Sequence, residues 1–344
     1  MAEAETGAAV EIRGLYKIFG ARPDECVNLV KEGMPKKELN EEHGHVLALN
    51  NINLDIAPGS VQVIMGLSGS GKSTLIRHVN RLIDPTAGSI LVDGVDVVDM
   101  SLHDLRQFRR NKTAMVFQNF ALLPHRTVLD NTVYGLEVQG MSRAKRNEIA
   151  MRWIDRVGLS GFEDHYPNQL SGGMQQRVGL ARALTNDAPI LLMDEAFSAL
   201  DPLIRTDMQS VLLDLQKEVR KTILFITHDL DEALRLGDKI AILRDGAMIQ
   251  QGTSQEIVLQ PADDYVASFV REVNRGKVVQ VRPLMEALSG TDWPEITIAG
   301  NATLDRAVQA FAHNGVTALS VLDDNDQKQG VITMRRALEA LVAD

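Results

Sequence analysis

A run of small residues around one lysine is the first stretch of the sequence whose residue types and spacing could do chemistry. Residues 66–74 read GLSGSGKST, between a strand-like stretch, SVQVIM, and apolar residues at helical spacing. Glycines at such a junction allow backbone N–H groups and the positive end of the helix to surround a phosphate. Lys72 would reach the β- and γ-phosphates, and the Ser73 hydroxyl is suited to Mg²⁺. The residues expected to form this nucleoside triphosphate site are Gly66, Ser68, Gly69, Ser70, Gly71, Lys72, Ser73 and Thr74.

Two adjacent carboxylates end the apolar run ILLMDE at residues 190–195. The four apolar residues predict a buried strand, which presents its last residues at the edge of a sheet. Asp194 is expected to join the Mg²⁺ shell, and Glu195 is expected to orient or deprotonate the water that attacks the γ-phosphate. A pair that caps a helix is the alternative. The phosphate loop disfavours it, because that loop supplies a metal and a phosphate that need partners.

A second candidate anion site lies at residues 170–177, LSGGMQQR. Ser171 would cap a helix that begins near Met174, and Gly172 and Gly173 would expose further N–H groups at the helix end. One nucleotide already wrapped by the loop at 66–73 cannot easily use both sites in the same chain. A two-fold dimer, in which this site meets the partner's γ-phosphate, is the economical arrangement. A plain helix cap is the alternative for so short a string.

The elements that must position these residues alternate between strands and helices. The segments PILLMDE and KTILFITHD read as buried parallel strands, and the amphipathic helix between them predicts a βαβ crossover. Strand-like alternation also occurs at residues 10–19. The dipeptides DG at 93–94 and 245–246 each indicate a hairpin.

Two segments are expected to be helical. Residues 20–45 form a polar insert in which Pro35 is suited to a helix start, and residues 119–180 look mostly helical. After about residue 277 the character changes. Residues 303–333 read as a helix, a strand, an acidic turn and a strand, which predicts a separate small unit.

Composition narrows the class of protein. Of the 344 residues, 36 are Lys or Arg and 46 are Asp or Glu, and the resulting net charge of −10 argues against a general nucleic-acid binder. The single cysteine, Cys26, allows no intrachain disulfide and favours a reducing compartment. No apolar run approaches the roughly 18 residues that span a bilayer. If the protein works at a membrane, other chains are expected to supply the spanning part.

Taken together, the motifs resemble those of the ATP-binding subunits of ABC transporters across about residues 8–270. The matching segments are GLSGSGKST, MVFQNF, LSGGMQQR, ILLMDE, SALD and ITHD. The resemblance implies an α/β P-loop NTPase fold: a RecA-like core, an antiparallel β subdomain and a helical subdomain. The segments IMGLSGSGKSTLIRHVNRLI and LLMDEAFSALDPLIRT, with the insert at 20–45, are similar to the importers of quaternary ammonium compounds such as glycine betaine, choline or proline. Met174, where the wider family usually has glutamine, is common in that subfamily.

The resemblance also implies roles for residues at matching positions. Phe19 would stack on adenine, with a core aromatic as the alternative. Gln118 would contact Mg²⁺ and the attacking water and link the site to the membrane partner. His228 would contact the γ-phosphate, Asp201 would couple the two sites of the dimer, and the segment 119–135 would face the membrane subunit.

The implied activity is an ATPase with ATP and Mg²⁺ as cofactors, acting at the cytoplasmic face of the inner membrane. The implied partners are a second copy of the chain, two transmembrane permease subunits and a separate substrate-binding protein, with no nucleic acid. A soluble ABC ATPase that acts on nucleic acid or ribosomes is the alternative. Such proteins usually carry two cassettes or a long coiled-coil insertion, and neither occurs in this sequence.

The expected domains are an ABC ATP-binding domain at 1–275 and a small α+β module at 277–344. The module resembles a single CBS unit, with one convincing copy at about 296–344 and a shortened first copy expected at 277–295. CBS units usually work in pairs, so this copy could pair with its twin in the dimer. Regulation and passive dimerisation both remain open for it, and a protein that is chiefly a small-molecule sensor is a third reading.

Overall fold

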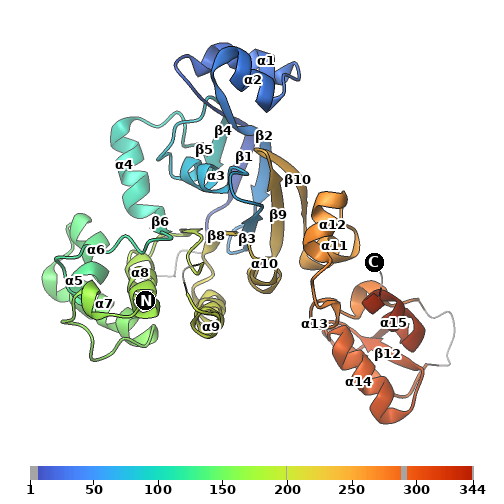
Figure 1. Ribbon diagram of the computed structural model, residues 1–344. Coiled ribbons are helices and arrows are strands. Elements are labelled where there is room, and N and C mark those ends of the chain that lie inside the picture. Colours follow the sequence, from blue (N-terminus) through green and yellow to red (C-terminus); the bar gives the residue numbers. More distant parts are fainter. Residues whose placement is uncertain (1–6, 199, 288–292, 343–344) are drawn as a thin grey trace. The chain divides into compact units, whose positions relative to one another are not determined.

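The chain forms two compact units, residues 1–249 and 250–344, in the computed structural model (Figure 1). The structure describes residues 7–198, 200–287 and 293–342. Within these ranges, every helix is too short or too polar to cross a bilayer.

A six-stranded sheet forms the centre of the first unit, in the order β10-β9-β3-β8-β7-β6. Strand β3 pairs in parallel with β8 and β9, and β7 pairs in parallel with β6 and β8. Every residue of β3, β7 and β8 is buried, which explains their unbroken apolar runs. The strands are β3 (Val61–Met65), β6 (Thr113–Val116), β7 (Ile190–Asp194), β8 (Thr222–Thr227), β9 (Lys239–Arg244) and β10 (Ala247–Gly252).

Three helices follow strands of this sheet along the chain. Helix α3 (Lys72–Val79) leaves the glycine-rich loop after β3, and α10 (Leu230–Leu236) follows β8. Helix α9 (Pro202–Val219) connects β7 to the parallel strand β8. The predicted βαβ crossover is therefore confirmed.

A four-stranded antiparallel sheet, in the order β2-β1-β4-β5, packs against the central sheet. Its apolar residues share one core with the central sheet and with α3, as the buried cluster of Ile12, Leu54, Ile64 and Leu75 shows. The DG pair at 93–94 forms the predicted hairpin between β4 and β5. The elements are β1 (Val10–Phe19), β2 (Val46–Ile56), β4 (Ala87–Val92), β5 (Val95–Asp96) and the following helix α4 (Leu102–Asn111).

The polar insert between β1 and β2 is helical, as predicted. It consists of a 3₁₀ turn, η1 (Pro23–Cys26), and two helices, α1 (Val27–Lys31) and α2 (Lys36–His43). Pro35 is the N-cap of α2, which agrees with the expectation that it precedes a helix start. Cys26 is buried in the insert and forms no disulfide.

The expected helical region gathers into one group beside the central sheet, drawn in green in Figure 1. Ser171 occupies the N-cap position of its last helix. The elements are α5 (Val128–Thr132), α6 (Tyr134–Val138), α7 (Arg143–Arg156), the 3₁₀ turn η2 (Pro167–Gln169) and α8 (Gly172–Thr185).

The second unit contains a three-stranded sheet in the order β11-β12-β13 and the predicted helix–strand–turn–strand sequence. Gln255 on α11 makes two hydrogen bonds within this unit. Its amide nitrogen donates to the carbonyl of Val278, and its amide oxygen accepts from the N–H of Gln280. The domain boundary expected near residue 276 stays a prediction. The compact unit begins at residue 250, but compactness does not show where an independently folding domain begins. The elements are α11 (Ser254–Leu259), α12 (Asp264–Val270), α13 (Arg275–Val278), η3 (Arg282–Leu284), β11 (Thr297–Ala299), α14 (Leu304–Asn314), β12 (Ala318–Leu322), β13 (Lys328–Thr333) and α15 (Met334–Val342).

Candidate active site

The glycine-rich loop forms one wall of a pocket of about 440 Å³. Ser68 to Thr74 all line this pocket, as do Gln118 and Glu195. Gly71 adopts a φ of +101° at the N-cap of α3. A Cβ atom at this position would lie 2.6 Å from the carbonyl oxygen of Ala48 on β2, so only glycine allows the loop this close to the antiparallel sheet.

Lys72 points into the loop that precedes it. Its Nζ donates to the carbonyl oxygens of Gly66 (2.7 Å) and Leu67 (3.0 Å), and the residue is 5% exposed. Burial lowers the pKa of the Lys72 ammonium, while the nearby carboxylates of Glu195 and Asp194 act in the opposite direction. A phosphate that enters the pocket would offer the ammonium stronger acceptors than the two carbonyls.

Asp194 lies at the end of β7 beside the first turn of α3. The Ser73 hydroxyl donates to its Oδ1 (2.8 Å), and Nη2 of Arg77 lies 3.2 Å from its Oδ2. The sequence reasoning missed Arg77. The signal was its spacing, because a residue four positions after Ser73 on the same helix lies on the same face.

Glu195 is the point at which segments from three strand ends meet. Its Oε2 accepts a hydrogen bond from Nε2 of Gln118 (3.2 Å) and lies 3.5 Å from Nδ1 of His228. Its Oε1 lies 3.9 Å from Nζ of Lys72. The backbone of Glu195 adopts a φ of +46°, which is uncommon for a residue with a side chain and is a form of strain often found at functional sites.

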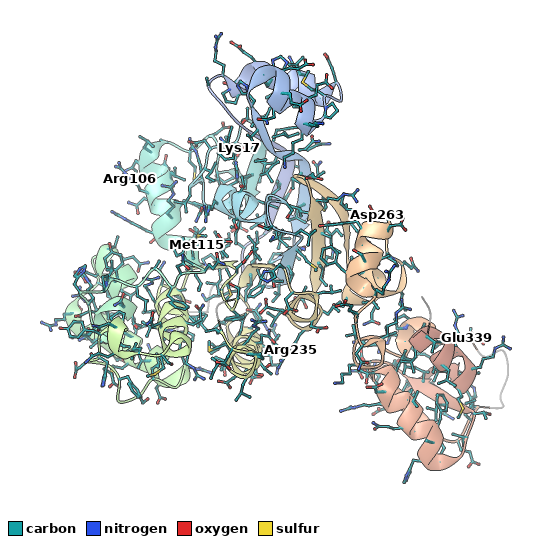
Figure 2. The ribbon with its side chains drawn as sticks, viewed as in Figure 1. Lys17, Arg106, Met115, Arg235, Asp263 and Glu339 are labelled. Atoms are coloured by element: carbon teal, nitrogen blue, oxygen red, sulfur yellow. The ribbon has the colours of Figure 1, made fainter. Side chains whose placement is uncertain are left out.

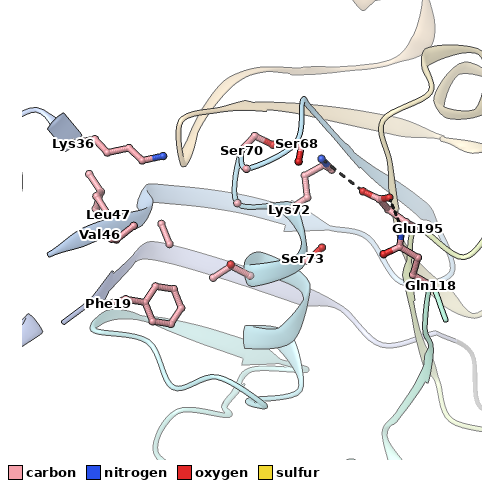
Figure 3. Close-up of a pocket in the computed structure, with 14 residues that line it drawn as sticks. Phe19, Lys36, Val46, Leu47, Ser68, Ser70, Lys72, Ser73, Gln118 and Glu195 are labelled. Carbon is pink, nitrogen blue, oxygen red and sulfur yellow. Dashed lines mark hydrogen bonds and ion pairs between the residues drawn. The ribbon is translucent and has the colours of Figure 1, made fainter. Parts of the chain in front are cut away.

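The opposite end of the pocket is formed by Phe19 and the start of β2. Phe19 is 43% exposed and therefore lies outside the buried core. The ammonium of Lys17, labelled in Figure 2, lies 4.9 Å from the centre of the ring. Figure 3 shows Phe19 at one end of the pocket and Lys72, Gln118 and Glu195 at the other.

Four further residues that line the pocket were missed by the sequence reasoning. Lys36, Val46, Leu47 and Ala48 come from the insert and from β2. The sequence offered only the presence of a polar insert before the strand, and that signal does not tell which of its residues faces the pocket.

The second candidate anion site does not line this pocket within one chain. The Ser171 hydroxyl accepts from the N–H of Met174 (3.3 Å), so it caps α8 as expected. A Cβ atom at Gly172 would meet no heavy atom within 4 Å, so the start of α8 is open at this residue. A Cβ atom at Gly173 would lie 2.7 Å from Cγ2 of Ile204, so Gly173 packs closely against that side chain.

Asp201 also caps a helix. Its Oδ1 accepts from the N–H groups of Leu203 and Ile204, both at 3.1 Å, at the start of α9. Ala199, within the SALD segment, lies outside the described residues.

The donor set near the loop fits Mg²⁺. The Ser73 hydroxyl and the Asp194 carboxylate are oxygen ligands of the kind that Mg²⁺ prefers, and the amide oxygen of Gln118 is a third candidate. Among the described residues, no group of three or more His, Cys, Asp or Glu side chains could hold a metal. A Mg²⁺ ion that arrives with phosphates needs only one or two protein carboxylates, so a single Asp is sufficient.

Comparison with known proteins decides the family. A family model described as "ABC transporter" matches residues 49–198. The glycine betaine transport ATP-binding protein OpuAA of Bacillus subtilis (strain 168) is 47% identical over 348 residues, which cover 100% of this chain and 81% of OpuAA. The chain belongs to the ABC transporter family. The resemblance inferred from the motifs is thereby confirmed, and the chain is an ATP-hydrolysing cassette of the ABC type.

Other members of the ABC transporter family support the same assignment. The glycine betaine/proline betaine transport system ATP-binding protein ProV of Escherichia coli (strain K12) is 48% identical over 326 residues, covering 95% of this chain and 78% of ProV. The ADP- and phosphate-bound dimer of the cassette MJ0796 matches with a TM-score of 0.60 and 34% identity, over 71% of this chain and 98% of that one.

The expected fold is also confirmed. The ABC cassette contains the P-loop core, and a "CBS domain" family model matches residues 291–343. The single CBS-like copy predicted at about 296–344 therefore corresponds to a CBS domain.

Proposed function

We propose that this chain is the ATP-hydrolysing subunit of an importer of quaternary ammonium compounds such as glycine betaine, choline or proline. The proposal rests on the convergence of Lys72, Gln118 and His228 on the carboxylate of Glu195 at one end of the nucleotide pocket. The relatives OpuAA and ProV, whose names state glycine betaine transport, support the substrate class.

In the proposed reaction, the carboxylate of Glu195 accepts a proton from the attacking water. The side chains of Gln118 and His228 both contact Oε2 of that carboxylate, which helps to orient it toward the γ-phosphate. Lys72 would leave the carbonyls of its own loop and neutralise charge on the β- and γ-phosphates. Positioning and charge stabilisation are sufficient, so no covalent intermediate on the protein is needed.

Mg²⁺ would be held by Ser73, Asp194 and Gln118. When bound, it would neutralise charge on the β- and γ-phosphate oxygens. At the other end of the pocket, Phe19 would stack on the adenine ring.

Two copies of the chain would enclose two ATP molecules at their interface. The helix start at Ser171–Gly173 is absent from the pocket lining of its own chain, so a partner's nucleotide is the natural ligand for it. The dimeric ABC cassette MJ0796 supports this arrangement. ATP provides the contacts that favour the closed dimer, and hydrolysis removes them. Asp201, which caps α9, would couple the two sites.

A shallow groove supports the proposed contact with permease subunits. It has a volume of about 380 Å³ and is lined in part by Leu82, Phe117, Ala121 and Tyr134. Leu82 and Tyr134 are 51% and 40% exposed, so a docking partner would cover apolar surface there. Two permease subunits and a separate substrate-binding protein would complete the importer, with this subunit on the cytoplasmic face of the inner membrane.

The nucleic-acid alternative is not supported. The net charge of −10 disfavours it, and the relatives named above are described as transport proteins. Pairing of the CBS domain with the same domain of the second copy would provide the usual two units.

The test is reconstitution of the chain with its permease subunits and binding protein in vesicles. Glycine betaine, choline and proline are added one at a time while phosphate release is measured. We expect at least one of them to stimulate ATP hydrolysis and to accumulate in the vesicles. If none of them does either, the proposed substrate class is wrong, and ATP hydrolysis that continues in the same samples would leave the ATPase assignment intact.

A further inference from the structure

The insert between β1 and β2 is anchored beside the nucleotide pocket by its own small core. Val27, Val30 and Leu39 of the insert are buried against Tyr16 and Leu47 of the antiparallel sheet. Leu39 is fully buried and lies one helical turn after the first residue of α2. The position of the start of α2 relative to β2 is therefore fixed by packing.

That fixed helix start brings one cation into the pocket. Lys36, the first residue of α2, lines the pocket together with Phe19 and Val46. Its Nζ lies 3.8 Å from Oδ1 of Asp245. The Lys36 side chain is 37% exposed, whereas that of its neighbour Lys37 is 85% exposed and lies 3.8 Å from Glu41 on the same helix.

The partner of Lys36 belongs to a turn that touches the phosphate loop. Asp245 and Gly246 join β9 to β10, and the N–H of Gly246 donates to the carbonyl of Ser70 (3.1 Å). The carbonyl of Gly246 accepts from the N–H of Asn50 on β2 (2.8 Å). Lys36 and the Asp245–Gly246 turn thus connect the insert to the phosphate loop.

The location of Lys36 within the pocket indicates which part of a nucleotide it would meet. Lys72 and Glu195 mark the end that receives the terminal phosphate. Figure 3 shows Lys36 on the other side of the loop, on the side of Phe19, with its amino group directed toward the loop that carries Ser70.

We propose that Lys36 is a nucleotide-binding residue of this cassette. Its ammonium donates to acceptors on the nucleoside half of ATP, the ribose oxygens and the ring nitrogens of the base. Asp245 is the partner of the ammonium without nucleotide, and it competes with those acceptors once ATP is bound. This inference rests on the proposed ATP site and extends it to the insert, which thereby becomes part of the binding machinery.

The test compares two neighbouring lysines. Wild type, Lys36→Met and Lys37→Met are titrated with ATP and with ADP by isothermal calorimetry at the same ionic strength. Each substitution removes one charge at the start of the same helix, so Lys37→Met controls for the general electrostatic effect. We expect Lys36→Met to weaken both ATP and ADP about 5- to 10-fold, or about 1–1.4 kcal/mol, and Lys37→Met to change affinity less than twofold.

Two further variants keep the result interpretable. Lys36→Arg retains the cation and is expected to recover most of the affinity, which a purely structural role of the insert would not require. Asp245→Asn removes the partner of the lysine. It is expected to leave ATP affinity unchanged or increased in the wild-type background and to have no effect when combined with Lys36→Met.

The outcomes separate this inference from the proposed function. Equal affinity of Lys36→Met and wild type for ATP overturns the inference and leaves the ATPase intact, whereas a wild-type chain that binds no ATP overturns both. A loss that is larger for ATP than for ADP overturns the assignment to the nucleoside half, because it would place the ammonium on the γ-phosphate. Thermal unfolding without nucleotide checks each variant, and a Lys36→Met chain that unfolds early is replaced by Lys36→Gln in the same comparison.

Discussion

Two glycines of the phosphate loop offer a sharp test of how this site is built. Gly69 and Gly71 both have positive φ, at +78° and +101°. A Cβ atom at Gly69 would meet no heavy atom within 4 Å, whereas one at Gly71 would lie 2.6 Å from Ala48 O and 2.9 Å from Leu49 Cδ2. Gly69→Ala therefore adds backbone strain alone, and Gly71→Ala adds the same strain plus a collision with a paired strand.

The expected magnitudes follow from these contacts. A left-handed backbone costs a residue with a side chain about 1–2 kcal/mol, and alanine recovers about 0.4–1 kcal/mol by restricting the unfolded chain. Gly69→Ala should therefore lower the free energy of unfolding by about 0–1.5 kcal/mol. Overpacking adds about 1–3 kcal/mol for Gly71→Ala, because a backbone carbonyl cannot move aside as a flexible side chain can. That difference corresponds to a further fall in melting temperature of about 2–12 °C.

The assay is thermal unfolding of both variants and wild type, followed by circular dichroism with and without ATP. Gly71→Ala should melt below Gly69→Ala. It should also gain less stability from ATP, because a displaced loop no longer directs its N–H groups at the phosphates. Equal melting temperatures and equal ATP-induced shifts for the two variants would refute the argument that β2 holds the loop in place.

Three further predictions concern carboxylates. Glu195→Gln should lower ATP turnover by about 10²- to 10⁴-fold while ATP-dependent dimerisation persists, measured by phosphate release and light scattering. Burial raises the pKa of Glu232 above its usual 4.5. At pH values above 4.5, the folded chain therefore binds more protons than the unfolded chain. The free energy of unfolding is expected to fall as the pH rises through this range. Glu232→Gln, which keeps the oxygen that accepts from Gln209 (3.0 Å), should remove this dependence in urea unfolding across a pH series. Asp201→Ala should lower the free energy of unfolding by about 1 kcal/mol, whereas Asp201→Asn should preserve the helix cap and differ little from wild type in urea.

Each of these has an outcome that contradicts it. Glu195→Gln that hydrolyses ATP at the wild-type rate would remove the assigned base. An unchanged pH slope in Glu232→Gln would show that other groups set that slope. If Asp201→Asn were as unstable as Asp201→Ala, the two bonds to backbone N–H groups would not account for the role of Asp201 in stability.

Local patterns were sufficient for the elements that carry the chemistry. The apolar run before Asp194 predicted a buried strand, and the loop composition at 66–74 predicted a strand-to-helix junction, because both depend on residues adjacent in the chain. Lys36 and Arg77 were missed for different reasons. Arg77 was within reach of a helical-spacing argument, whereas Lys36 enters the pocket only because the insert packs on the antiparallel sheet.

The sequence by itself determined that the site binds a nucleoside triphosphate. The phosphate loop, the carboxylate pair and the capping serine each consist of a few consecutive residues, so they can be recognised without the fold. Only the tertiary structure decided which of them meet. Gln118, Glu195 and His228 follow β6, β7 and β8, and they converge because these strands are neighbours and end at the same edge of the sheet. Strand order arises from packing across the whole core, and spacing along the chain does not encode it. The same packing distinguishes Gly71, which lies against β2, from Gly69, which does not, although the two residues look alike in the sequence.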